Sequence, residues 1–202
     1  MPNQQLVGTA RTMRPDSSAL GIKMQDLLLE HKNKRNLISI ERKDIDQNKI
    51  QAFVLGASRN LVLIQYVYDF NIDGLMVLRV SDISDISCSK TDIFQLKLLK
   101  DEKLFDQINF EQKYNLTDWK ATIADLRKDF DYFIFEDENK DDPIFLIGKI
   151  EKMTSRSIHL NYFSGAGNWD KKPSVIKYCD ITACQVDTNY TNVYKRYFER
   201  NS

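Results

Sequence analysis

Cysteine and histidine are the residue types in this chain that most often bind metal or act as nucleophiles. There are three cysteines, Cys88, Cys179 and Cys184, and two histidines, His31 and His159. Cys179 and Cys184 are close in sequence, but no second close pair of ligands accompanies them, as a zinc site normally requires. Three cysteines are also too few, and an odd number, for a disulfide framework. We therefore expect buried or inert thiols, no metal and no other cofactor.

Four further patterns could carry chemistry, and each has a simpler explanation. His159 lies in a predicted strand, and no serine or cysteine with a nucleophile motif accompanies it. The acidic run 137–142 lacks the glycine and glutamate spacing of a calcium loop. The glycine-rich turn 165–167 leads into a strand, not into the helix N-terminus that binds a dinucleotide phosphate. The basic run 31–35 stands at a helix end, where cations complement the helix dipole; a nucleic-acid contact is the alternative there.

Composition limits the function classes. The chain has 202 residues, 42% of them hydrophobic, with 29 basic and 29 acidic side chains. The apolar fraction can build a core, and the zero net charge argues against a protein that binds nucleic acid or an anionic membrane by bulk charge. No apolar run approaches the roughly 18 residues of a spanning helix, and the polar first 14 residues do not form a secretory signal. We expect a cytoplasmic protein with no membrane partner and no DNA partner, and a disordered tail at 1–15.

The chain repeats itself. Residues 59–63 are similar to residues 156–160 at an offset of 97, and residues 77–84 are similar to residues 175–182 at an offset of 98. Two blocks in the same order at nearly the same offset indicate a duplication with one residue gained between them. We therefore divide the chain into a first repeat at 16–105 and a second repeat at 106–202.

Each repeat is predicted to contain a helix followed by five short strands. Before the strands, an amphipathic pattern begins after Asp16 or Ser17 in the first repeat and after Thr117 in the second. Further helices are expected at 91–104 and 190–198. The predicted strands are 37–41, 50–56, 60–68, 75–80 and 84–89 in the first repeat, and 132–136, 144–153, 157–163, 174–178 and 182–187 in the second. Since open strand edges are unfavourable, we expect each set of five to close into a small barrel.

Aromatic residues gather in two places, at the end of a predicted strand and in the last predicted helix. Their members are Tyr66, Tyr68 and Phe70, and Tyr190, Tyr194, Tyr197 and Phe198. The first interpretation is packing in the core and between repeats, and the alternative is an aromatic surface for a protein partner.

A helix followed by five bent strands resembles the Sm-like small barrel, a relative of the SH3-like barrels. The second Sm signature is an aliphatic residue, Arg or Lys, Gly, two free positions, and Ile or Val. Residues 78–83 and 176–181 match it, except that Val80 and Tyr178 replace the glycine. The resemblance implies a mainly β protein with flanking α-helices, made of two tandem five-stranded Sm-like or SH3-like small barrels, each preceded by a helix.

The first Sm signature begins at a glycine in the second strand. Gly148 can take that position in the second repeat, whereas Gln51 stands there in the first. Tandem repeats of this kind are known mainly from uncharacterised bacterial proteins, so the resemblance implies a bacterial protein but no specific activity.

The resemblance also implies a place for single-stranded RNA. RNA-binding Sm-like proteins hold a base with an acidic residue and an asparagine between strands two and three, and with the Arg or Lys and the Gly of the second signature. Asn60 keeps the amide, and Arg79 and Lys177 match the basic position, but the acidic residue and both glycines are missing. With Arg59 and Arg156 from the same loops, the RNA-binding residues implied by the resemblance are Arg59, Asn60, Arg79, Arg156 and Lys177.

These observations rank three functions. The first is a non-enzymatic module that binds another macromolecule, with a protein as the expected partner, through loops or an exposed strand edge. The alternative is single-stranded RNA binding through the five residues just named. An enzyme of unknown type comes third, since it would require a deep pocket with titratable groups of perturbed pKa. Assembly of several copies into an oligomer is left open.

Overall fold

The computed structural model describes residues 17–139 and 141–201, so the tail expected at 1–15 lies outside the described residues. The first half contains α1 (Ser17–Lys34), β1 (Leu37–Arg42), β2 (Asp46–Ala57), β3 (Leu61–Tyr68), β4 (Asn71–Arg79), β5 (Asp85–Ser87) and α2 (Lys90–Asp101). The second half contains α3 (Trp119–Leu126), β6 (Tyr132–Asp137), β7 (Ile144–Met153), β8 (Ser157–Tyr162), β9 (Ser174–Lys177), β10 (Ala183–Val186) and α4 (Asn189–Arg200). Short 3-10 turns lie at Val80–Asp82 and Phe105–Gln107.

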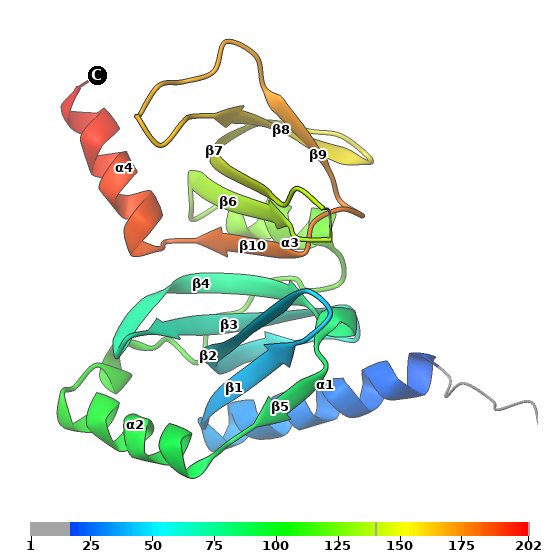
Figure 1. The fold of residues 1–202 in the computed structure, drawn as a ribbon, viewed down its shortest axis with the longest axis vertical. Coiled ribbons are helices and arrows are strands. Elements are labelled where there is room, and N and C mark those ends of the chain that lie inside the picture. The colour runs from blue at the N-terminus through cyan, green and yellow to red at the C-terminus, as the bar shows by residue number, and fades with distance from the viewer. Residues whose placement is uncertain (1–16, 140, 202) are drawn as a thin grey trace, which may run out of the picture.

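The described strands form one open sheet in the order β5-β1-β2-β3-β4-β10-β6-β7-β8-β9. The prediction of two separate five-stranded small barrels, whether Sm-like or SH3-like, is therefore wrong. The physical reason is visible in the middle of the molecule, where β4 of the first half pairs with β10 of the second (Figure 1). β10 takes up the backbone hydrogen bonds that the edge of β4 would otherwise leave open. The first half therefore does not need to close into a barrel to cover that edge.

The two halves of the sheet are built alike. Within each half the strand order is fifth, first, second, third, fourth. Glu41 in β1 lies opposite Asp85 in β5, and Glu136 in β6 lies opposite Ala183 in β10. The backbone N–H of Ser84 donates to the Glu41 carbonyl at 2.8 Å, and that of Thr182 donates to the Glu136 carbonyl at 2.8 Å. The same register thus recurs in both halves, at offsets of 95 for the first strand and 98 for the fifth.

The register corrects the predicted position of the glycine in the second strand. Gly148 lies opposite Phe133 on one side and Tyr162 on the other. Ala52 occupies the corresponding place in the first half, opposite Ile38 and Tyr66. The counterpart of Gly148 in the first half is therefore Ala52 and not Gln51. Both halves have a small residue at this position.

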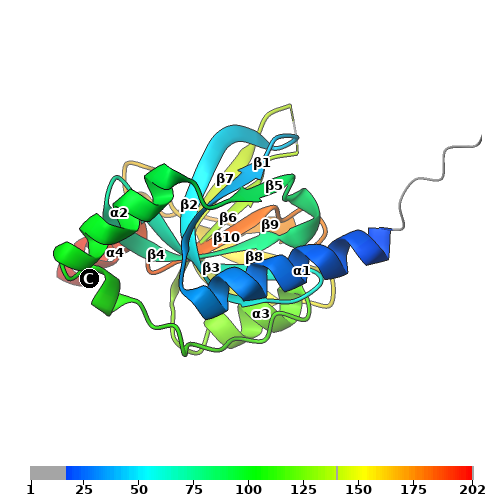
Figure 2. The same cartoon turned by 90° about the horizontal axis from the view of Figure 1, so that it is seen from below.

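Helix ends are fixed by local side chains. The Ser89 hydroxyl accepts the Asp92 backbone N–H, and the Asp92 carboxylate accepts the Ser89 N–H in return, which starts α2. Asp118, one residue after the predicted Thr117, caps α3 by accepting the Ala121 N–H at 2.8 Å. In both views α2 and α4 lie to the left of α1 and α3, with α2 beside the first half and α4 beside the second in Figure 1 (Figures 1 and 2).

One apolar cluster runs through both halves. It contains Leu37 and Phe53 from the first half together with Phe133, Phe135 and Ile158 from the second. A second cluster in the first half takes in Ala183 of β10. Because burial of these side chains crosses the β4–β10 junction, we expect the two halves to stabilise each other.

Candidate functional site

The turns that carry three of the predicted RNA-binding residues, Arg59, Asn60 and Arg156, have the same construction in both halves. In the β2–β3 turn the Ser58 hydroxyl accepts the Leu61 N–H at 3.0 Å, while the Ser58 N–H donates to the Leu61 carbonyl at 2.8 Å. In the β7–β8 turn Thr154 makes the matching pair of bonds with Ser157, at 2.9 and 2.8 Å. Serine and threonine favour such turns because their hydroxyls bond the nearby backbone.

This match changes the correspondence between the repeats. The Asn60 carbonyl accepts the Val80 N–H at 2.8 Å, and the Arg156 carbonyl accepts the Tyr178 N–H at 3.1 Å. Arg156 is therefore the counterpart of Asn60, at an offset of 96, and Arg59 corresponds to Ser155. The second half has no amide side chain at the position of Asn60.

Three of the five predicted residues meet at one pocket of about 300 Å³. Arg59, Asn60 and Arg79 line it together with Ser81, Asp118 and Trp119, among others. Asp118 and Trp119 come from the start of α3, so the pocket lies where the two halves meet. Arg156 and Lys177 do not line this pocket, although the Arg156 carbonyl bond to Tyr178 keeps them near each other.

The charges around this pocket largely cancel. The Arg79 guanidinium donates from Nε to Asp82 Oδ2 at 2.7 Å and from Nη1 to the Cys179 carbonyl at 3.4 Å. The Asn60 amide donates to the Thr117 carbonyl at 2.8 Å, and the Asp118 carboxylate adds a second negative charge. A phosphate here would have to compete with these partners.

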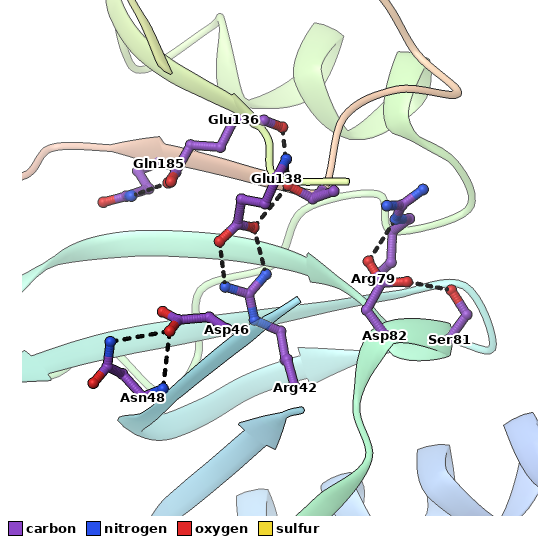
Figure 3. A network of polar contacts seen from close by, with 10 residues as sticks. Arg42, Asp46, Asn48, Arg79, Ser81, Asp82, Glu136, Glu138 and Gln185 are labelled. Carbon is purple, nitrogen blue, oxygen red and sulfur yellow. Dashed lines mark hydrogen bonds and ion pairs between the residues drawn. The ribbon is translucent and has the colours of Figure 1, made fainter. Parts of the chain in front are cut away.

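A polar network that the sequence did not reveal lies beside the β4–β10 junction (Figure 3). The Arg42 guanidinium donates to both carboxylate oxygens of Glu138, at 2.7 and 2.9 Å. The Thr182 hydroxyl donates to the same carboxylate at 2.7 Å. Arg42 and Glu138 are 96 residues apart and mostly buried, so this ion pair ties the first half to the second. The one available signal was Arg42 itself, a charged residue directly after the predicted strand 37–41, and it does not identify its partner.

Glu136 belongs to the same network. Its carboxylate accepts a hydrogen bond from the Gln185 amide at 2.5 Å. Burial raises the pKa of the Glu136 carboxyl above its ordinary value of 4.5, although the bond from Gln185 opposes that rise. Burial also raises the pKa of the Cys184 thiol, and this disfavours the thiolate that nucleophilic chemistry requires.

Aromatic residues divide between a packed cluster and a surface. Phe163 contacts the rings of Tyr194 and Phe198, with ring centroids 4.8 and 5.0 Å apart. Tyr190 and Tyr197 of α4 remain exposed. The packing interpretation is therefore confirmed for Tyr194 and Phe198, whereas an aromatic surface for a partner stays a prediction for Tyr190 and Tyr197.

The two ends of the sheet are the remaining surface feature. Within the described residues β5 pairs only with β1, and β9 pairs only with β8. Val175 of β9 is 57% exposed, whereas its counterpart Val77 in β4, which has β10 beside it, is 1% exposed. Asp85 of β5 is also exposed. Each end thus presents a row of backbone groups with no strand of residues 17–139 or 141–201 on its outer side.

Residues 17–139 and 141–201 contain no group of three or more His, Cys, Asp or Glu side chains that could hold a metal ion. Among the helices in these ranges, none is both long enough and apolar enough to cross a membrane. Comparison with protein-family models, with curated proteins and with solved structures gives no match to this chain.

Proposed function

We propose that this chain is a non-enzymatic binding module that holds a protein partner by adding a strand of that partner to an open edge of its sheet. The observation that supports the proposal is the place of β9 at the end of the strand order, where β8 is its one partner among the described strands. Val175 on this strand is 57% exposed, against 1% for its counterpart Val77. Val77 lies in the large apolar cluster that both halves form, whereas Val175 lies on a face of the second half where Lys149 and Asn161 are also exposed.

Strand addition suits such an edge for two reasons. Backbone N–H and C=O groups along the edge supply affinity, and side chains at alternate positions supply specificity. The chain already joins its own halves in this way, since β10 lies beside β4 with four residue pairs in register. An added strand on β9 would place a residue beside Val175 as β10 places Cys184 beside Val77.

The proposal is tested by selecting displayed peptides against the full chain and locating them by amide hydrogen exchange. We expect the selected peptides to protect the amides of β5 or β9. Val175→Lys should weaken peptides that bind at β9, because an edge lysine opposes strand pairing. Val193→Lys, at a 47% exposed position on α4, is the matched control and should bind them normally. Protection confined to residues away from both edges would refute the proposal.

Single-stranded RNA binding is a second candidate, supported by the convergence of Arg59, Asn60 and Arg79 on one pocket beside Trp119. The guanidinium groups could contact phosphates, and the indole could contact a base. We expect such binding to be weak, because Asp82 and Asp118 offset the two arginines. Fluorescence anisotropy with a labelled oligonucleotide pool tests it. Binding at low salt that Arg59→Ala reduces would support RNA, and absence of binding at low salt would exclude it.

A further inference from the structure

We propose that β9, and not β5, is the receptor edge, and that its ligand is an extended segment of another protein with a small apolar residue opposite Ile176 and acidic residues on either side. This inference rests on the proposed function, since it assigns the edge and the chemistry of the added strand. Three observations support this inference: the register of the β4–β10 junction, the lysines beside β9 and the position of Asp85.

The junction between β4 and β10 serves as a template for the missing strand. Ala183 lies opposite Leu78, and Cys184 lies opposite Val77. All four side chains are buried. The strand that fits the β4 edge therefore has a small residue at the position of Ala183 and an apolar residue at the next position.

The same template applies to β9 because β9 is the counterpart of β4. Ile176 corresponds to Leu78, and Val175 corresponds to Val77, at the offset of 98 seen in the sequence. Ile176 is 4% exposed and belongs to the large apolar cluster, so its side of β9 faces the core. A large or charged side chain opposite Ile176 would be buried without a partner, which is unfavourable.

The charge around β9 defines the flanks of the ligand. Lys171, Lys172 and Lys177 are all exposed, and with Asp170 and Asp180 next to them the segment 170–180 carries a net charge of +1. In the template register, the residue before the small apolar one falls opposite Lys177. Acidic residues at the flanks would therefore meet positive charge, and salt would weaken their contribution.

Asp85 makes β5 unsuitable as the added strand or as the receptor. It is the counterpart of Ala183, so a second copy that placed its β5 beside β9 would bring the Asp85 carboxylate next to Ile176. In its own half Asp85 is exposed and lies opposite Glu41, whose carboxylate binds Lys43 at 2.8 Å and Lys49 at 2.6 Å. Burial would remove water from this charged group. The occupant of β9 is thus a strand without a charge at this position, which excludes the chain's own β5.

The experiment uses a synthetic peptide with the sequence of residues 181–188 of this chain as the probe, because this segment fits the equivalent edge. The full chain, under reducing conditions, is titrated with this peptide and with the same peptide carrying Ala183→Asp. We expect the parent peptide to protect the amides of β9 from exchange and to bind at least about tenfold more tightly than the Ala183→Asp peptide. A Thr182→Glu peptide should bind more tightly still, by an increment that disappears at high salt.

The variants of the full chain provide the controls. Val175→Lys should abolish protection at β9, whereas Val193→Lys should leave it unchanged. Equal binding of the parent and Ala183→Asp peptides, binding of neither, or protection at β5 would overturn the inference. If library-selected peptides still protect an edge in that case, the proposed function stands and only the assignment of the ligand fails.

Discussion

The buried ion pair between Arg42 and Glu138 is the polar contact that most directly joins the two halves. Both side chains lie largely out of water, and two short hydrogen bonds connect them. Removal of one partner leaves the other charge buried without compensation, which costs more than the intact pair contributes. The importance of this pair for stability is therefore best measured by removing one side and then both.

Replacement of Arg42 by methionine should lower the free energy of unfolding by about 3 to 5 kcal/mol. The double variant Arg42→Met with Glu138→Leu should recover much of this loss, because no isolated charge remains. Urea unfolding followed by circular dichroism measures both, and Arg196→Met on the exposed side of α4 is the control. A double variant less stable than Arg42→Met would contradict this explanation.

Glu136 gives a prediction that depends on pH. Its pKa is raised in the folded chain by burial, so folding holds the proton more tightly than the unfolded chain does. The stabilising contribution of the protonated form is complete below the ordinary value of 4.5 and is lost as pH rises through the raised value. Glu136→Gln should thus be more stable than wild type near neutral pH and equal to it well below 4.5. Urea titrations at both pH values test this, and a constant difference would argue against the mechanism.

At the residue level the sequence located part of the pocket. Arg59, Asn60 and Arg79 do lie together, because Arg79 ends β4 opposite Leu61, the residue that follows Asn60. The sequence did not predict Asp118 and Trp119 as pocket residues, because their position beside Arg59 depends on how α3 packs against the first half. The similarity of residues 59–63 to residues 156–160 also suggested an offset between the repeats that is one residue too large. The hydrogen bonds in the turns correct it.

At the level of elements the strands were predictable and their pairing was not. All ten predicted strands are present, with ends that differ by up to four residues, because runs of β-branched and aliphatic residues signal strands locally. Local periodicity carries no information on which edges meet. The β4–β10 contact joins residues more than 100 positions apart, and either closure of each half or pairing between halves would have fitted the same pattern.

Gly148 tests the closeness of β7 and β8. A Cβ atom at this position would lie 1.9 Å from the Asn161 carbonyl oxygen, which is backbone and cannot simply rotate away. Gly148→Ala should therefore destabilise the chain by about 3 kcal/mol or more, through displacement of the strand. Gly165→Ala is the control, because the nearest atom, the Tyr194 hydroxyl, is 4.0 Å away. Thermal unfolding of both variants measures the difference in stability. Equal melting temperatures would refute the close approach of β7 and β8 at Gly148.

At the scale of the whole molecule, one sheet made of two similar halves ends in two unlike edges, β5 and β9. The junction between the halves buries Ala183, whereas the corresponding residue at the outer edge is the exposed Asp85. The resemblance between the halves was readable from the sequence. The role of Asp85 was not, because it becomes apparent only when the register of both halves is compared.

Asp85→Ala should allow copies of the chain to associate through β5 of one and β9 of the next. Sedimentation velocity over the micromolar range should show larger species for this variant than for wild type. Addition of Val175→Lys in the same chain should remove them, and Asp101→Ala at the end of α2 is the control. Identical sedimentation of Asp85→Ala and wild type would show that Asp85 does not limit pairing at this edge.

Cross-strand contacts measured by nuclear magnetic resonance show whether a peptide adds as a strand to the open edge of the sheet. The full chain, isotopically labelled, is examined in complex with a peptide selected for binding. We predict antiparallel contacts between α-protons of the peptide and those of β9, with one side chain of the peptide against Ile176. Contacts found only at α4 or at the Arg59 pocket, with the signals of β5 and β9 unchanged from the free chain, would contradict strand addition at the edge.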